Sequence, residues 1–127
     1  MSRSTFRRDL LQKLIVAKID LSAYLTLRRA KGYMTIVENE HLRDNLFDLC
    51  NEYREKLPEV QAGLMPQEIT SFDRGIAAVS SAAVCLMTGR HDCPHYIAVD
   101  ADRLESCLDQ LAHSLNGLLV CQQAIEA

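Results

Sequence analysis

The chain has 127 residues, the usual size of one domain, of which 48% are hydrophobic and 24% are charged. Five glycines and three prolines are too few for a low-complexity or disordered chain, so we expect a single folded domain over residues 1–127. The net charge of −3 is unevenly placed: residues 1–34 carry eight Lys and Arg against two Asp, and residues 35–127 carry six against fifteen acidic residues.

The first predicted helix covers residues 4–31. Apolar side chains recur there at spacings of three and four, which places them on one stripe. The stripe consists of Phe6, Leu10, Leu14, Ala17, Leu21 and Leu25. Ser4 or Thr5 is a suitable N-cap, and Gly32 follows a basic last turn, as is typical of a helix end.

The end of this helix is the first candidate site. Arg28, Arg29 and Lys31 are followed by Tyr33, and three cations beside aromatic rings are able to bind an anion or a small aromatic ligand. Helix capping is the simpler interpretation, because cations stabilise the last turn of a helix. A basic arm for nucleic acid is less favoured, since the cations are spread along the whole helix.

The second predicted helix begins at Thr35, which forms a capping box with Glu38, and extends to about residue 56. One face carries four acidic side chains at intervals of four. They are Glu40, Asp44, Asp48 and Glu52. Because like charges at this spacing repel each other, we expect the basic first helix, or a partner protein, to lie beside them.

Residues 57–66 contain two prolines and a glycine and predict the longest loop, with a short helical turn from Pro58. A third helix over residues 66–88 has a regular apolar seam and many small residues. It is therefore either the central helix or the interface of a homodimer. Its uncharged run of fifteen residues, 75–89, is shorter than the roughly 20 that a membrane span needs, so no membrane contact is expected.

The fourth helix starts near Asp100 or Asp102, both good N-caps. These segments predict an all-α chain: a four-helix antiparallel up-down bundle, with an apolar loop containing Cys and His between the third and fourth helices. The loop alternates at Tyr96, Ile97 and Val99 like a short extended strand. We expect it to pack on one end of the bundle.

A cluster of soft ligands lies where the third helix ends. Cys85, His91, Cys93 and His95 supply the four N and S ligands of a zinc site, but their spacing matches no common zinc motif. An extended loop would also point alternate side chains to opposite sides. A packed helix end, with Asp92 helping to set a turn, is the favoured interpretation, and we expect no bound metal.

A thiol function is a second interpretation of the same cluster, because neighbouring imidazoles favour the thiolate of Cys93. Redox sensing is more plausible there than catalysis, since the sequence has no oxyanion or triad motif. Elsewhere, Glu38 and His41 have the spacing of a di-iron ligand pair, but the required second copy is missing. We therefore expect neither enzyme activity nor a cofactor.

Three passages resemble the BssR family of enterobacterial biofilm regulators. They are DLLQKLIVAKIDLSAYLTLRRAKGYM (9–34), HLRDNLFDL (41–49) and AAVCLMTGRHDCPHYIAVDADRLESCL (82–108). The family pattern is similar at Cys85, Gly89, His91, Asp92, Cys93 and Pro94. His95 is not part of that pattern, which weakens a metal site with four ligands.

The resemblance implies a cytoplasmic regulator of signalling and stress response that represses biofilm formation and is linked to the secretion or uptake of signals such as indole and autoinducer-2. It implies no catalytic residue. Five scattered cysteines without a CxxC motif agree with a reducing compartment. We expect action through contacts with a protein partner. A sensor of a small apolar signal, bound near Tyr33, Tyr96 and His91, and a DNA-binding regulator are the alternatives.

Overall fold

The computed structural model describes the backbone of residues 3–88, 90–93 and 96–126, and the side chains of residues 5–88 and 96–119. The described part of the chain is mostly helical, which confirms the all-α prediction. It contains α1 (Arg3–Lys31), β1 (Met34–Thr35), α2 (Ile36–Glu55), α3 (Leu57–Gly63), α4 (Pro66–Met87), β2 (Arg90–Cys93), β3 (Tyr96–Ala98) and α5 (Ala101–Glu126).

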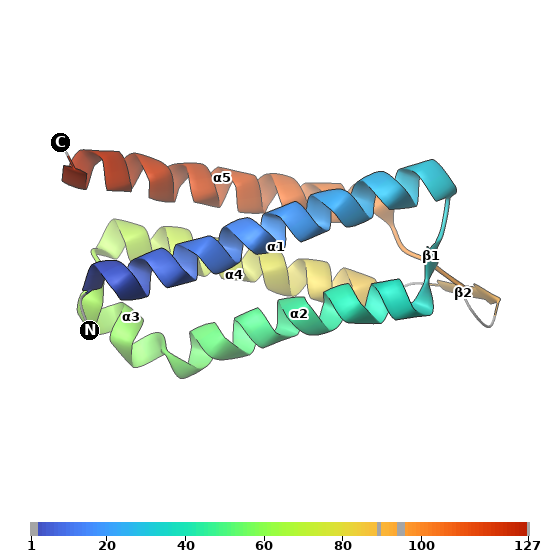
Figure 1. Cartoon of the computed structure of the whole chain (residues 1–127), viewed down its shortest axis with the longest axis horizontal. Helices are drawn as coiled ribbons and strands as arrows, with labels where there is room; N and C mark the ends of the chain where they lie inside the picture. The colour runs from blue at the N-terminus through green and yellow to red at the C-terminus, as the bar shows by residue number, and fades with distance from the viewer. Residues whose placement is uncertain (1–2, 89, 94–95, 127) are drawn as a thin grey trace.

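The four long helices lie side by side, and successive ones run in opposite directions (Figure 1). The chain ends lie together at one end of this helical body, and the strands lie at the other. α4 packs most extensively on α5 and next on α2, while α1 packs more on α5 than on α2. The pair α1 and α2 is therefore the least tightly joined of the neighbouring long helices.

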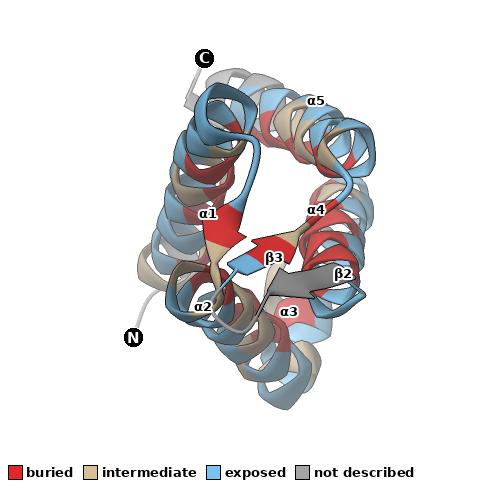
Figure 2. Ribbon diagram, turned by 90° about the vertical axis from the view of Figure 1, so that its right-hand side faces the viewer, coloured by how far each residue is buried: buried red, intermediate tan, exposed pale blue. Residues whose placement is uncertain are grey.

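The core is built from the apolar stripes that the sequence predicts. Buried residues face the interior of the helical body, as the end-on view shows (Figure 2). The largest fully buried side chains are Phe72, Leu14, Leu21, Met34, Leu46, Leu86, Leu104, Leu111, Leu118, Val60, Val79 and Val99. All four long helices contribute to this list, so burial of one stripe from each supplies most of the hydrophobic stabilisation.

Small residues let α4 approach α5 closely. A Cβ atom added at Gly75 would lie 3.0 Å from the Oγ of Ser114, and one added at Gly117 would lie 3.2 Å from the Oγ of Ser71. The Ser114 hydroxyl donates a hydrogen bond to the Ser71 carbonyl. Gly75, one of the small residues that made α4 a candidate for the homodimer interface, thus contacts α5 within the chain, whereas Ala77 and Ser81 are exposed. α4 takes the central position.

Among the described helices, α4 alone is long and apolar enough to meet a length-and-composition criterion for a membrane span, with 22 residues and a hydropathy of 1.2. Core helices of proteins without any membrane segment meet the same criterion. Phe72 and Val79 of α4 are fully buried within the chain. Part of α4 thus lies in the core of the chain, with 44% of its apolar window buried.

The expected loop between the third and fourth long helices is instead part of a small sheet. The strand order is β1-β3-β2, and both pairs are antiparallel. Met34 pairs with Ile97, and Thr35 pairs with Tyr96. Ile97 and Met34 are buried, so the sheet covers this end of the core (Figure 2). The sequence analysis missed β1 because its partner strand lies some sixty positions away.

Most helix ends lie where the sequence predicts them, and two predictions need correction. Thr35 and Glu38 form the predicted capping box, and Gly32 takes the positive φ of 83° that ends α1. The carboxylate of Asp100, rather than that of Asp102, accepts a hydrogen bond from the Arg103 backbone amide and caps α5. Residues 57–63, expected as a loop with one helical turn, form the separate helix α3.

Two buried polar contacts connect helices far apart in the sequence. The Arg7 guanidinium pairs with the Glu68 carboxylate and donates a 3.0 Å hydrogen bond to the Leu118 carbonyl, which joins α1, α4 and α5 near the chain ends. At the other end, the Asn39 amide donates a 3.0 Å hydrogen bond to the Leu86 carbonyl, and the Tyr24 hydroxyl donates a 2.8 Å hydrogen bond to Asn39. These groups satisfy each other, which makes their burial tolerable.

Candidate functional site

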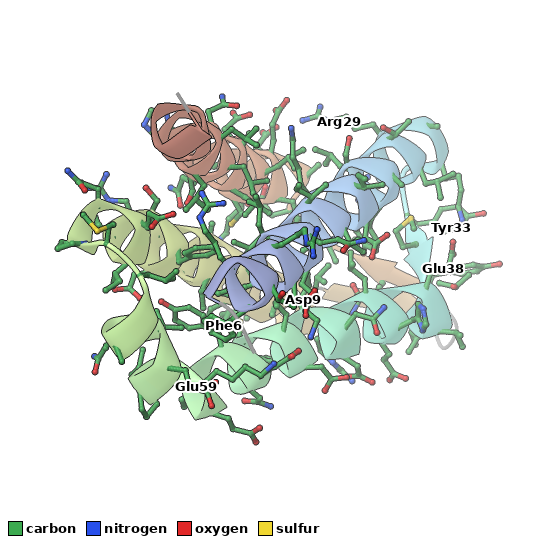
Figure 3. The ribbon with its side chains drawn as sticks, turned by 60° about the vertical axis from the view of Figure 1, so that its left-hand side comes forward. Phe6, Asp9, Arg29, Tyr33, Glu38 and Glu59 are labelled. Atoms are coloured by element: carbon green, nitrogen blue, oxygen red, sulfur yellow. The ribbon has the colours of Figure 1, made fainter. Side chains whose placement is uncertain are left out.

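The sheet brings together several of the candidate residues from the sequence. The rings of Tyr33 and Tyr96 meet edge to face with centroids 4.5 Å apart, and the Lys31 ammonium lies 5.5 Å from the centre of the Tyr33 ring. Both tyrosines are exposed. Figure 3 shows Tyr33 and Glu38 at the same end of the helical body. The arrangement is an aromatic surface with one nearby cation.

The cations at the end of α1 already have partners. The Arg28 guanidinium donates a 3.1 Å hydrogen bond to the Val99 carbonyl, and Lys31 pairs with Glu38 at 3.2 Å. Arg29 pairs with Glu105 at 2.8 Å. These contacts fix α1 to the segment between β3 and α5, to α2 and to α5, which agrees with the capping interpretation of this cluster better than with an anion site.

The Glu38 carboxylate is held in its charged form. It accepts hydrogen bonds from the Thr35 hydroxyl at 2.8 Å and the Thr35 amide at 3.1 Å. These bonds, with the Lys31 ammonium as a smaller contribution, lower the pKa of Glu38 below its ordinary value. Glu38 is thus a structural carboxylate that joins the α1 terminus to the start of α2.

Cys85, the one member of the Cys/His cluster with a described side chain, is a core residue. It is 2% exposed, and its thiol donates to the Asp100 carbonyl at 3.7 Å. Burial raises its pKa, which disfavours a thiolate ligand or nucleophile. The side chains of His91, Asp92, Cys93 and His95 lie outside the described residues, so joint coordination stays untested there. No potential metal cluster of His, Cys, Asp or Glu occurs among the described residues.

The other described thiols and the buried tyrosines are also unsuited to reaction. Burial raises the pKa of Cys50 and of Cys107, and both are free thiols within the core. Burial also raises the pKa of Tyr24 and of Tyr53, whose hydroxyl donates to the Asp73 carboxylate. Groups with raised acid pKa values stay neutral, and here they stabilise the core.

The acidic face of α2 is only partly neutralised by α1. Lys13 of α1 pairs with Glu52, which also accepts a 2.9 Å hydrogen bond from Lys56. The Lys13 hydrogen bond is the main reason that the pKa of Glu52 is lowered. Asp48 has no ion-pair partner among the described residues, and Asp44 pairs only with its neighbour Arg43. The predicted neutralisation by the first helix thus holds at Glu52 and fails at Asp48.

A groove of about 410 Å³ separates α1 from α2. Its apolar lining comes from both helices and consists of Val16, Ala17, Leu46 and Leu49. Its charged lining consists of Asp9, Asp20, Asp48, Glu52 and Lys13. Asp9 lies on the side of α1 that faces α2 (Figure 3). The groove therefore combines an apolar floor with a negative rim, because four carboxylates face one ammonium.

The sequence analysis did not predict this groove. One signal was available: Val16 lies outside the apolar stripe of the first helix, and Asp9 and Asp20 flank it. Two further hollows, of about 540 Å³ between α4 and α5 and about 690 Å³ between α1 and α5, have no comparable charge. The hollow beside α5 and α1 is mainly apolar, with Ile19 and Leu119 exposed.

Comparison with known proteins identifies the family. The model of the biofilm formation protein family (YliH/bssR) matches residues 1–124. The chain belongs to this family. It is similar to the biofilm regulator BssR of Escherichia coli strain K12, with 47% identity over 112 residues, which cover 88% of each chain. The biofilm regulator BssR of Shigella flexneri is similar to the same extent. No solved structure matches.

Family membership supports a role in biofilm regulation. The family is one of regulators and corresponds to no known enzyme class. The candidate residues at the sheet, in contrast, are mostly occupied by contacts within the chain. Of the carboxylates that line the α1/α2 groove, Asp9, Asp20 and Asp48 have no ion-pair partner among the described residues, whereas Glu52 is paired.

Proposed function

We propose that this protein regulates biofilm formation by contact with a protein partner and without catalysis. The observation that carries the proposal is that the described thiols are buried, whereas several carboxylates line a groove at the surface. The described thiols and buried hydroxyls are engaged in the core, whereas Asp9 and Asp48 are exposed and Asp20 is half-buried in a groove that also contains the exposed side chain of Val16. A surface of this kind suits recognition, because burial of its apolar part is favourable and its charges select a complementary partner.

The proposal treats the four long helices as one antiparallel up-down bundle that presents its outer faces. The protein acts in the cytoplasm, away from the membrane, as a repressor of biofilm formation that is linked to the secretion or uptake of signals such as indole and autoinducer-2. Self-association through the exposed side of α4 is a further part of the proposal. The similarity to the BssR regulators supports the role in biofilm regulation.

In-cell cross-linking tests the proposal. Growing cells that carry a tagged chain at its normal level are treated with a non-specific chemical cross-linker, and the adducts are sized and identified. We expect an adduct of fixed mass with another protein, and a rise in biofilm mass when the chain is deleted. A chain that restores normal biofilm but forms no adduct with any protein would contradict action by protein contact.

A signal-sensing protein is the second candidate, and the paired rings of Tyr33 and Tyr96 favour it. Stacked or edge-on aromatic rings are common in sites for flat apolar ligands. A thermal-shift series with indole tests this function. Stabilisation that disappears in Tyr33→Ala and Tyr96→Ala would support it, because a ligand that binds only the folded chain raises its melting temperature. No shift at millimolar indole would remove it.

DNA binding has the weakest support. Four of the cations of α1 that would form a basic arm contact groups of the chain itself: Arg7, Lys13, Arg29 and Lys31 pair with carboxylates. Cations that are already paired contribute little to phosphate binding, which depends on release of counterions from the nucleic acid. A mobility-shift assay at low salt is expected to show no complex with duplex DNA.

A further inference from the structure

The α1/α2 groove has the shape and charge to hold one more helix. We propose that it binds a basic amphipathic helix of the protein partner, with apolar side chains on the floor and Lys or Arg side chains against the rim. This inference rests on the proposed function and names the surface and the chemistry of its partner. Grooves between helices are common binding sites for amphipathic helices.

One residue of the groove floor, Val16, is exposed, and the other three are buried. Val16 is 48% exposed although its neighbours Leu14 and Ala17 are buried, and the small Ala17 side chain leaves space beside it. On α2, the buried side chains of Leu46 and Leu49 line the same hollow. An apolar side chain that enters the groove would lose contact with water on most of its surface, which is the main gain in this type of binding.

The rim supplies charge complementarity. Asp9 and Asp20 lie eleven positions apart on α1, which corresponds to about 17 Å or three helical turns. Asp48 lies on the opposite side, on α2, and none of these three carboxylates has an ion-pair partner within the described part of the chain. A helix with cations on both flanks of an apolar stripe would neutralise both sides of the rim.

Ion pairs join α1 and α2 at two places. Lys13 pairs with Glu52 within the lining of the groove, toward the end where the chain termini lie, and Lys31 pairs with Glu38 at the sheet. Over their whole length the two helices pack less than any other pair of neighbouring long helices. The site is therefore preformed, and a partner helix would not need to separate α1 from α2.

Fluorescence anisotropy with a designed peptide tests the proposal on the full chain. The probe is a labelled peptide of about 18 residues, built from Leu and Lys as an amphipathic helix. A peptide of the same composition with the apolar stripe scrambled is the control. We expect the amphipathic peptide to bind at least about tenfold more tightly, and less tightly as salt is added. Equal binding of the two peptides would overturn the proposal.

Matched variants locate the peptide. Asp48→Lys in the groove is compared with Asp109→Lys on α5, and Val16→Lys is compared with Val84→Lys, since Val16 and Val84 are similarly exposed at 48% and 41%. We expect each groove variant to weaken binding about tenfold or more and each control variant less than about twofold. All four sites are exposed, so melting temperatures should stay near that of the parent chain. Equal losses in groove and control variants would overturn the proposal.

Competition with spermine distinguishes a site for an amphipathic peptide from a site for polyamines. Spermine carries positive charge but has no apolar face. We expect displacement of the peptide only at concentrations about 100-fold above those of the unlabelled peptide. Displacement at equal concentration would overturn the proposal.

A photo-reactive residue in place of Val16, with Val84 as control position, then tests the groove in cells. The expected adduct joins the photo-reactive residue at position 16 to a partner segment that has the pattern of an amphipathic helix, with Lys or Arg beside its apolar stripe. A partner captured by the non-specific cross-linker but never at Val16 would reject the groove and leave the proposed function intact. Absence of both adducts would reject both.

Discussion

The helix pairs α4/α5 and α1/α2 differ in how closely their two helices pack. At α4/α5, Gly75 and Gly117 bring the helices so close that an added Cβ atom would contact a serine hydroxyl. At α1/α2, the helices are joined by the ion pairs Lys13–Glu52 and Lys31–Glu38 and leave a groove whose lining includes Lys13 and Glu52. Small residues thus allow one pair to pack closely, and the other pair packs less and is joined by ion pairs.

Because of this difference in packing, we expect the α4/α5 pair to matter mainly for the stability of the fold and the α1/α2 pair to matter mainly for binding of a partner. α4 and α5 approach closely at Gly75 and Gly117 and contribute many of the fully buried side chains, so we expect a large part of the free energy of folding to depend on that side of the molecule. The exposed ion pairs at α1/α2 contribute little each, and the apolar floor beside them stays available to a partner. Substitutions that alter one pair should therefore affect properties that substitutions in the other pair leave unchanged.

The largest expected effect is in the core of α4. Phe72 is 0% exposed, and Phe72→Ala should lower the free energy of unfolding by about 3–5 kcal/mol, because it removes buried surface and leaves a cavity. The matched change Val16→Ala in the groove should cost less than about 1 kcal/mol. Urea denaturation measures both values. Similar costs at the two positions would show that the α1/α2 pair is as closely packed as α4.

A smaller effect is expected where α4 meets α5. Gly75→Val places a branched side chain against the Ser114 hydroxyl and should cost about 1–3 kcal/mol through overpacking. Ala77→Val, on the exposed side of the same helix, is the control and should change the free energy of unfolding by less than about 0.5 kcal/mol. Equal melting temperatures for the two variants would argue against the close approach of α4 and α5.

The cap of α2 should have an effect of about 1 kcal/mol. Thr35→Ala removes the hydroxyl that accepts from the Glu38 amide at 3.1 Å and donates to the Glu38 carboxylate at 2.8 Å. Thr35→Ser keeps that hydroxyl and should retain most of the stability. Thermal denaturation followed by circular dichroism compares the two. A loss in the serine variant as large as that in the alanine variant would assign the effect to the Thr35 methyl group instead.

The smallest effect is expected at the ion pair beside the groove. Lys13→Gln should cost about 0.2–1 kcal/mol and bring the pKa of Glu52 closer to its ordinary value, because the Lys13 hydrogen bond is the main cause of its lowering. A lowered folded-state pKa stabilises the fold above the unfolded-state pKa, and that contribution is lost as the pH falls through the folded-state pKa.

As the pH is lowered, the free energy of unfolding should therefore decrease less in Lys13→Gln than in the parent chain. A carbon-detected NMR titration of the Glu52 carboxyl checks the cause. An unchanged pKa would mean that Lys56, which also contacts Glu52, accounts for the shift by itself.

Features that depend on neighbours within one or two helical turns could be predicted from the sequence. The apolar stripes, the Thr35 capping box and the glycine end of α1 at Gly32 are all determined by residues three to five positions apart. Family membership was likewise predictable, because it rests on continuous passages of sequence. The choice between Asp100 and Asp102 as the cap of α5 was not, since both side chains satisfy the local rule.

Features that depend on the distance between helices could not be predicted. β1 pairs with β3 across some sixty positions, and a two-residue strand has no periodic signal of its own. The Tyr33–Tyr96 contact follows from that pairing. The α1/α2 groove depends on how far apart α1 and α2 lie, although Val16 lies outside the predicted apolar stripe of the first helix and Asp48 belongs to the predicted acidic face of the second.

Biofilm mass in cells that carry Asp20→Lys/Asp48→Lys, at steady-state levels matched to the parent chain, is the most direct test of regulation through the α1/α2 groove. The account predicts that the double variant folds normally but behaves like a deletion, whereas Asp109→Lys, at a position lining the hollow between α4 and α5, regulates like the parent chain. Full regulation by the double variant, or equal loss in Asp109→Lys, would contradict it.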